Sequence, residues 1–350
     1  MKKGQAIKEV VQRINNDVQY KKDYIITQNA LQINTNTIGS FYPNIQLTDS
    51  PKEWNMTDHS LNQLCGRLEI GTRYIQKLLP VSQYMVAHNL NFWIRNNQSR
   101  DLMFRAFEKD GHGTCRAIMT NRYKRLDSDV VANHSLNKLM DMGAELKYSH
   151  YDRDSLNITA VLPELEGEVE EGDVVQGGIT ITNNEIGGGS LLIQPFIYRL
   201  VCTNGMVAPR YLNRFYAKHV GKIVIDPSND EQWVSIINKM QKQIELISNP
   251  ELFQENLQKL KEATAEKVTS HKIREITKYH GLSDFERKQI FERLDHYVSD
   301  TFSTSKYQLA NAITNIANDE DKSDQRARFL QELGGLIIFA NNPMGLKISA

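Results

Sequence analysis

The chain has 350 residues with 42 basic and 42 acidic side chains, so any binding to nucleic acid must come from local patches rather than from net charge. A hydrophobic fraction of 40% and a charged fraction of 24% are ordinary for a folded globular protein and exclude wholesale disorder. No window approaches the roughly 18 apolar residues of a membrane-spanning helix, so we expect no membrane partner. The three cysteines are widely spaced and form no Cys-x-x-Cys pair, which is typical of a reduced, cytoplasmic protein.

The first 54 residues are predicted to form an N-terminal helix and a connecting segment. Apolar residues recur at helical spacing between Ile7 and Ile14, among basic residues, which predicts a short amphipathic helix within residues 1–24. Residues 25–55 lose this periodicity, are rich in Asn and Thr and contain Pro43 and Pro51. We therefore expect a connection that holds at most one strand.

An α+β core domain with an antiparallel sheet is predicted for residues 55–225. Caps and apolar periodicity predict four helices: from Thr57 or Asp58 to Gly71, from Thr72 to Pro80, from about Ser82 to Asn96, and from Asp127 or Ser128 to Gly143. Two hairpins are predicted between and after them: residues 102–108 with 114–120, around a Lys-Asp-Gly-His-Gly turn, and residues 146–150 with 156–162, before an acidic loop over 164–173.

The segment from Val174 onward mixes β-branched residues with glycines and turn formers. Alternation over residues 174–183 predicts a strand, and three consecutive glycines at 187–189 allow a turn before a second strand. Pro195 stands where a first helical residue would, and Asn204-Gly205 where a left-handed cap would, so residues 196–203 are predicted to form a short buried helix. The glycines do not match a Walker or dinucleotide pattern, and we expect no cofactor.

A mainly helical C-terminal region is predicted over residues 226–350. Apolar stripes indicate helices at 233–247, within 252–279, and at 285–297, 307–317 and 325–333. No sheet signal is found there.

The sequence contains no motif that favours catalysis. No Gly-x-Ser-x-Gly elbow is present. The pairs Asp127 with Asp129 and Asp152 with Asp154 could hold a metal, but helix capping and Asx turns explain such pairs better. We therefore expect neither catalytic nor metal-binding residues, and an enzyme is the least supported class.

Two acid-poor basic segments with interleaved aromatic residues indicate binding to single-stranded nucleic acid. Basic side chains neutralise phosphates, and neighbouring rings stack on unpaired bases. The alternative interpretation is that the rings are core residues, because Phe104 and Phe107 must face opposite sides of a strand. The candidate nucleic-acid-binding residues are Arg105, Arg116, Arg122, Tyr123, Lys124, Arg125, Arg199, Arg210, Arg214 and Lys218.

Residues 61–79, 116–126 and 183–207 resemble a phage- and plasmid-borne family known as a domain of unknown function. The stretch Tyr-Arg-Leu-Val-Cys-Thr-Asn-Gly is the most specific part, and residues 307–317 and 328–335 are also similar. The resemblance covers roughly residues 55–340. It implies a mobile-element origin and cytoplasmic action, with no catalytic residues to transfer.

The predicted core is also similar in architecture to ring-forming single-strand annealing proteins of phage recombination, although architecture alone does not establish function. From these patterns we expect a phage- or plasmid-encoded protein that binds single-stranded DNA in recombination or strand annealing, as a homo-oligomer. The alternative is a non-enzymatic protein that binds a host or phage protein.

Overall fold

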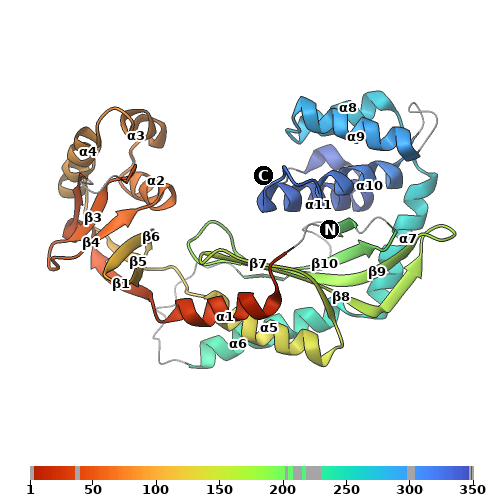
Figure 1. Cartoon of the computed structure of the whole chain (residues 1–350), viewed down its shortest axis with the longest axis horizontal. Coiled ribbons are helices and arrows are strands. Elements are labelled where there is room, and N and C mark those ends of the chain that lie inside the picture. The colour runs from red at the N-terminus through yellow and green to blue at the C-terminus, as the bar shows by residue number, and fades with distance from the viewer. Residues whose placement is uncertain are drawn as a thin grey trace.

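The computed structural model describes residues 4–35, 40–201, 204–207, 215–217, 230–297, 304–346 and 348. Within these residues the chain is an α+β protein, as the sequence predicts, with two separate large sheets that are mainly antiparallel. Figure 1 shows the first sheet with its helices at one end of the molecule and the second sheet, covered by helices on both faces, at the other.

Sheet 1 has the strand order β1-β5-β6-β4-β3-β2, in which β4 and β6 pair in parallel. Helices α2, α3 and α4 pack on one face of it, and their apolar residues join those of the strands in one core. The elements are β1 (Lys21–Thr27), β2 (Leu31–Asn34), β3 (Asn44–Leu47), β4 (Glu53–Met56), β5 (Asp101–Lys109), β6 (His112–Thr120), α2 (Asp58–Arg67), α3 (Thr72–Leu78) and α4 (Gln83–Asn96), with the 3-10 turn η1 (Gln28–Ala30).

Sheet 2 has the order β11-β10-β9-β8-β7, and β12 also pairs with β10. Its strands are β7 (Glu145–Tyr151), β8 (Ser155–Glu168), β9 (Val174–Asn184), β10 (Leu191–Arg199), β11 (Asn204–Val207) and β12 (Phe215–Ala217). One face packs on α1 (Ile7–Val18), α5 (Ser128–Asp141) and α6 (Asp230–Ile247). The other face packs on α7 (Pro250–Ala265), α10 (Lys306–Ile316) and α11 (Asp324–Phe339) (Figure 1).

The remaining elements complete the C-terminal helical layer. They are α8 (Ser270–Tyr279), α9 (Asp284–Tyr297), the 3-10 turn η2 (Pro343–Gly345), and the two-residue strands β13 (Lys267–Val268) and β14 (Thr304–Ser305). The β13–β14 pair is a small departure from the prediction of no sheet in this region.

The helices and the hairpin that local sequence signals predict are present in the structure. Thr57 caps α2 in a capping box with Ser60, and Ser82 caps α4. The β5–β6 hairpin turns at Asp110 and Gly111, both with positive φ (51° and 78°), as a two-residue type I′ turn requires. The pattern of caps and turns therefore predicts these elements correctly.

The prediction of a helix after Pro195 is wrong over the described residues. The chain continues as β10 to Arg199, paired with β9 on one side and with β12 and then β11 on the other. Proline cannot donate a ladder hydrogen bond, and Pro195 lies between the stretch that pairs with β12, up to Ile193, and the stretch that pairs with β11, from Phe196. Residues 202 and 203 lie outside the described part.

The N-terminal connecting segment contains more sheet than predicted. Strands β1 to β4 all precede residue 57, and the expected boundary between residues 54 and 55 falls inside β4. Strands β2, β3 and β4 have only four residues each and pair with one another, and so short a run shows too few alternations for periodicity to reveal a strand. The acidic loop is also shorter than expected, because β8 continues to Glu168. The expected boundary near residue 225 lies outside the described residues.

None of the helices in the described ranges combines the length and apolarity that a membrane span requires.

We expect Gly178→Ala to destabilise the protein by about 1–3 kcal/mol or more. A Cβ at this β9 position would press against the backbone carbonyl oxygen of Ala160 in β8, which cannot move aside easily. The matched control is Gly66→Ala in α2, where a Cβ meets no atom within 4 Å; it should be neutral or stabilising by about 0.5–1 kcal/mol. Urea denaturation of both variants tests this, and equal effects would contradict the packing argument.

Glu286 in α9 should make the free energy of unfolding depend on pH in the acid range. Burial opposes its charge, but hydrogen bonds from Arg326 and Ser283 outweigh burial and lower the pKa of Glu286 to about 2, from an ordinary 4.5. A lowered folded-state pKa adds stability above the ordinary pKa and loses it as the pH falls toward 2. The stability gap between wild type and Glu286→Gln should therefore be full near pH 7 and shrink between about pH 5 and 2. A pH-independent gap in denaturation midpoints would contradict this.

Candidate nucleic-acid interface

Arg105, predicted to contact phosphate, lies in the interior instead. Its side chain is fully buried, with Nε 2.8 Å from Asp23 Oδ1 and Nη2 2.7 Å from Asp127 Oδ1, and Nη1 donates to the Glu185 carbonyl oxygen at 2.7 Å. Although burial disfavours charged groups, the Arg105 guanidinium lowers the pKa of Asp127. Arg105 therefore has no route to a phosphate in this structure.

Arg116 is buried beside it in the same way. Its Nε lies 2.6 Å from Asp154 Oδ1, and its Nη2 lies 2.6 Å from the buried carboxylate of Glu185. Glu185 also binds Lys21 Nζ at 2.7 Å and the backbone N–H of Ser128 at 2.9 Å. Residues from sheet 1, from two loops of sheet 2 and from the N-cap of α5 thus meet in one charged joint, which we define as Lys21, Asp23, Arg105, Arg116, Asp127, Asp154 and Glu185.

Tyr123 and Arg125 belong to the edge of this joint. The Tyr123 hydroxyl donates to the Glu185 carbonyl oxygen at 2.9 Å, and burial raises the pKa of Tyr123. Arg125 Nη1 lies 3.1 Å from Asp23 Oδ2. Arg122 is exposed and Lys124 is half-buried, so the predicted hairpin surface is reduced to these two side chains and the partly exposed Arg125.

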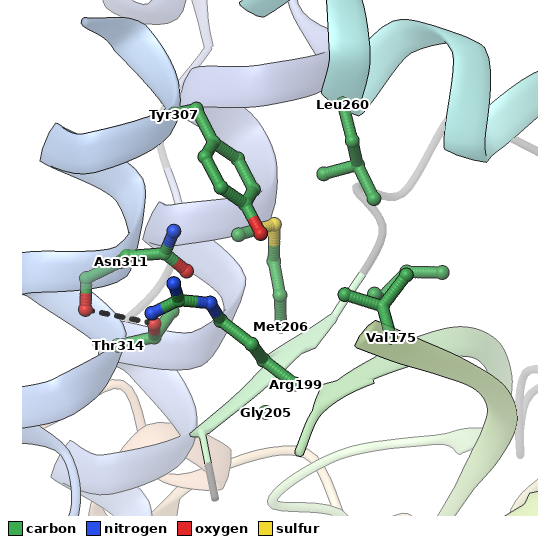
Figure 2. Close-up of a pocket in the computed structure, with 9 residues that line it drawn as sticks. Val175, Arg199, Gly205, Met206, Leu260, Tyr307, Asn311 and Thr314 are labelled. Carbon is green, nitrogen blue, oxygen red and sulfur yellow. Dashed lines mark hydrogen bonds between the residues drawn. The ribbon is translucent and has the colours of Figure 1, made fainter. Parts of the chain in front are cut away.

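The second predicted segment contributes one described residue. Arg199 Nε lies 2.6 Å from Asp173 Oδ1, and the Tyr307 hydroxyl donates to the other oxygen of this carboxylate at 2.9 Å. Figure 2 shows the Arg199 side chain directed toward Asn311 and Thr314 on α10, inside the contact between sheet 2 and the helical layer. Arg210, Arg214 and Lys218 lie outside the described residues.

The structure presents a different basic and aromatic surface on α3 and α4. Large apolar side chains are exposed there, with exposed fractions from 41% to 79%: Tyr74, Val81, Tyr84, Met85, Phe92 and Trp93. Residues 70–100 contain no Asp or Glu. We define the α3–α4 surface as these six residues together with the exposed basic side chains of Arg73, Lys77, Arg95 and Arg100.

The exposed rings follow from the way α4 packs. Its core face carries Val86, Ala87, Leu90 and Ile94, all buried against sheet 1 and the neighbouring helices. Tyr84, His88 and Phe92 recur every four residues on the outer side, so they form a row with about 6 Å between successive positions. The Tyr84 and His88 rings are stacked at 6.2 Å, and Phe92 and Trp93 meet edge-on at 5.3 Å. The three rings are therefore already arranged in a row before any ligand binds.

Cations at the end of this surface are incompletely neutralised. Arg67, the last residue of α2, has a buried Nε that makes no hydrogen bond within the described part of the chain. Burial and the nearby Arg100 guanidinium lower the pKa of Arg67. The Arg100 ion pair with the exposed Glu69 is loose, at 3.7 Å. A bound anion would relieve the repulsion between the two guanidinium groups.

Apolar periodicity did not reveal this surface, because α4 carries apolar residues on both faces and spacing alone cannot say which face is buried. The absence of acidic residues over 70–100 is the signal that was available in the sequence.

The acidic pairs considered as metal ligands have other partners: Asp127 and Asp154 bind the two buried arginines of the joint. In the described ranges, His, Cys, Asp and Glu side chains form no group of three or more arranged to hold a metal ion.

No protein-family model, curated protein or solved structure matches this chain. The resemblance to a phage- and plasmid-borne family therefore stays a prediction.

We expect Arg116→Met to destabilise the protein by about 3–5 kcal/mol, because it removes one partner of a buried ion pair and leaves Glu185 with excess buried charge. Arg122→Met, at an exposed position in the segment between β6 and α5, should change stability by less than about 0.5 kcal/mol. Guanidinium chloride denaturation of the two variants gives the comparison. A small effect of Arg116→Met would mean that the joint is hydrated rather than buried.

Proposed function

We propose that this protein binds single-stranded DNA through the α3–α4 surface. The observation that carries the proposal is the coincidence, on one surface, of exposed aromatic rings with a stretch of chain that contains four exposed basic residues and no acidic one. Rings that stack on bases beside cations that neutralise phosphates are the two components of sequence-tolerant single-strand binding.

Unpaired bases suit this surface better than a duplex. The rings of Tyr84, His88 and Phe92 lie along the exposed side of a helix, where they can receive bases that are splayed out of a strand. In a duplex the base faces are already stacked on one another and only the groove edges are accessible. Binding should therefore favour single strands and show little sequence preference.

The proposed cellular role rests on the predicted mobile-element origin and on the similarity of architecture to annealing proteins. A phage- or plasmid-borne protein that binds single strands in the host cytoplasm would serve recombination or strand annealing, and annealing proteins of this kind act as homo-oligomers that share one strand. In this proposal the joint residues Arg105 and Arg116 support the fold, and the phosphate contacts come from the α3–α4 surface.

A protein partner is the second candidate for the same surface. Its exposed apolar side chains, rimmed by polar ones, are also the composition of a protein-binding patch. The absence of acidic residues favours an anionic partner in either case. Substitution of the exposed rings separates the two candidates, because it should weaken binding to an oligonucleotide only if the surface binds single-stranded DNA.

Replacing Tyr84 and Phe92 together by Ala should weaken binding of a labelled oligonucleotide, by about 1–3 kcal/mol for each ring that stacks on a base. The matched control is Tyr279→Ala with Phe285→Ala, two exposed rings in the C-terminal layer, which should leave affinity unchanged. Fluorescence anisotropy measures both. Equal affinity for wild type and the α4 variant, or no binding by wild type at micromolar protein, would reject the proposal in favour of a protein partner.

The salt dependence identifies the phosphate contacts. Each contact should contribute a slope of roughly 0.7 in log affinity against log salt. Arg73→Gln with Arg95→Gln should lower the total slope by about 1.4 if both touch phosphate. Lys261→Gln with Lys267→Gln, two exposed lysines of the helical layer, should leave it unchanged. An unchanged slope in the first variant would place the phosphate contacts elsewhere.

A further inference from the structure

A cleft of about 560 Å³ lies between sheet 2 and the N-terminal half of α11. This volume falls within the range of roughly 300–1,000 Å³ found for small-molecule sites. The cleft occupies the end of the sheet where β7 and β9 finish and β8 and β10 begin. Figure 1 shows this end of sheet 2, with its β9–β10 loop, directed toward sheet 1.

The sheet face beneath α11 changes character toward the cleft. Farther along the sheet this face is apolar and carries the buried cluster of Val161, Phe196, Tyr198 and Val207. Near the cleft it carries polar side chains, mostly buried: Asn157, Thr159, Thr180, Thr182 and Gln194. A sheet face covered by a helix gains nothing from polar groups, because each must be compensated by a hydrogen bond. Helix packing therefore does not explain this polar stripe.

Two pairs of charged or titratable side chains are held in place at the cleft. His150 Nδ1 lies 3.2 Å from Asp324 Oδ2, and burial together with a hydrogen bond to the same carboxylate raises the pKa of Tyr148. On the next turns of α11, Arg328 Nε donates to Glu332 at 3.2 Å and its Nη2 donates to Gln194 at 3.4 Å. These contacts fix the orientation of both carboxylates and of the guanidinium group before any ligand arrives.

The charge of the residues that line the cleft restricts which classes of ligand can bind there. Among the residues that the structure describes, three carboxylates, those of Asp152, Asp324 and Glu332, line the cleft with one guanidinium, that of Arg328. This described lining is therefore net negative whether or not His150 carries a proton, which disfavours phosphates and other anions. The remaining groups are hydroxyls and amides, which both donate and accept hydrogen bonds. An uncharged ligand with several hydroxyl groups matches this set.

We propose that the cleft binds an uncharged ligand through a pair of adjacent hydroxyl groups, as found in the ribose of a nucleoside or in a pyranose sugar. A carboxylate accepts hydrogen bonds from two neighbouring hydroxyls, as acidic residues do with ribose in dinucleotide sites. The guanidinium of Arg328 supplies donors to the same oxygens. The glycines at 188 and 189 border the cleft without side chains that would fill it.

The test measures thermal stabilisation of the full chain by four probes at millimolar concentration. The probes are adenosine, 2′,3′-dideoxyadenosine, a methyl pyranoside and its 2,3-dideoxy derivative. We expect a concentration-dependent rise in Tm with a diol-bearing probe and none with its dideoxy counterpart. Whichever diol raises Tm identifies the source as nucleoside or sugar. No rise with either diol, or an equal rise with a dideoxy probe, would overturn the proposal.

Two arginines of α11 provide a matched pair of variants. Arg328 and Arg326 have similar side-chain exposure, 26% and 23%, and each pairs with a glutamate, but Arg326 lies outside the cleft. Arg328→Met should weaken binding of the diol at least about tenfold, as expected for a lost charged hydrogen bond, whereas Arg326→Met should leave it unchanged. Equal effects of the two variants would overturn the proposal, as would tighter binding of adenosine monophosphate than of adenosine.

Discussion

The arrangement of the two sheets depends on one buried carboxylate, that of Glu185. Without partners it would cost several kcal/mol in desolvation, and Lys21, Arg116 and the N–H of Ser128 all donate hydrogen bonds to it. These donors come from β1, β6 and the start of α5, so a residue that follows β9 binds groups on sheet 1 and on the helix that links the sheets. Hydrogen-bonded ion pairs are directional, whereas apolar contacts are not. The joint therefore fixes the angle between the sheets.

The same constraint decides which cations are available to a ligand. Arg105 and Arg116 each satisfy carboxylates inside the joint, and moving either to the surface would leave those carboxylates buried and unpaired. The four basic residues of the α3–α4 surface are exposed and do not balance those buried carboxylates. A chain with balanced total charge can thus hold a locally positive surface at one end, because many of its acids are used at the joint and in the helical layer.

Sequence predicted the elements whose signals are local and missed those that depend on distant partners. Thr57 and Ser82 mark helix starts because a cap acts on the next turn alone. The strand character of residues 196–199 arises from pairing on both sides of β10, which overrides the local helix signals. Likewise Arg116 and its acceptor Glu185 are 69 residues apart, so no window of sequence could show that this arginine is buried. The diol-binding cleft joins segments more distant still.

The loop between β9 and β10 connects the joint with both proposed sites. Glu185 anchors it to sheet 1, and the carbonyl oxygen of Ile186 accepts hydrogen bonds from His59 and Gln63 on α2. The next residues of the loop form one wall of the cleft. A ligand that fits the cleft in only one position of this loop would stabilise the matching position of α2, which contacts the helices of the α3–α4 surface. By thermodynamic linkage, single-stranded DNA bound to the α3–α4 surface would change the affinity of the cleft for its ligand. The factor would equal that by which the ligand changes the affinity of the surface for the DNA.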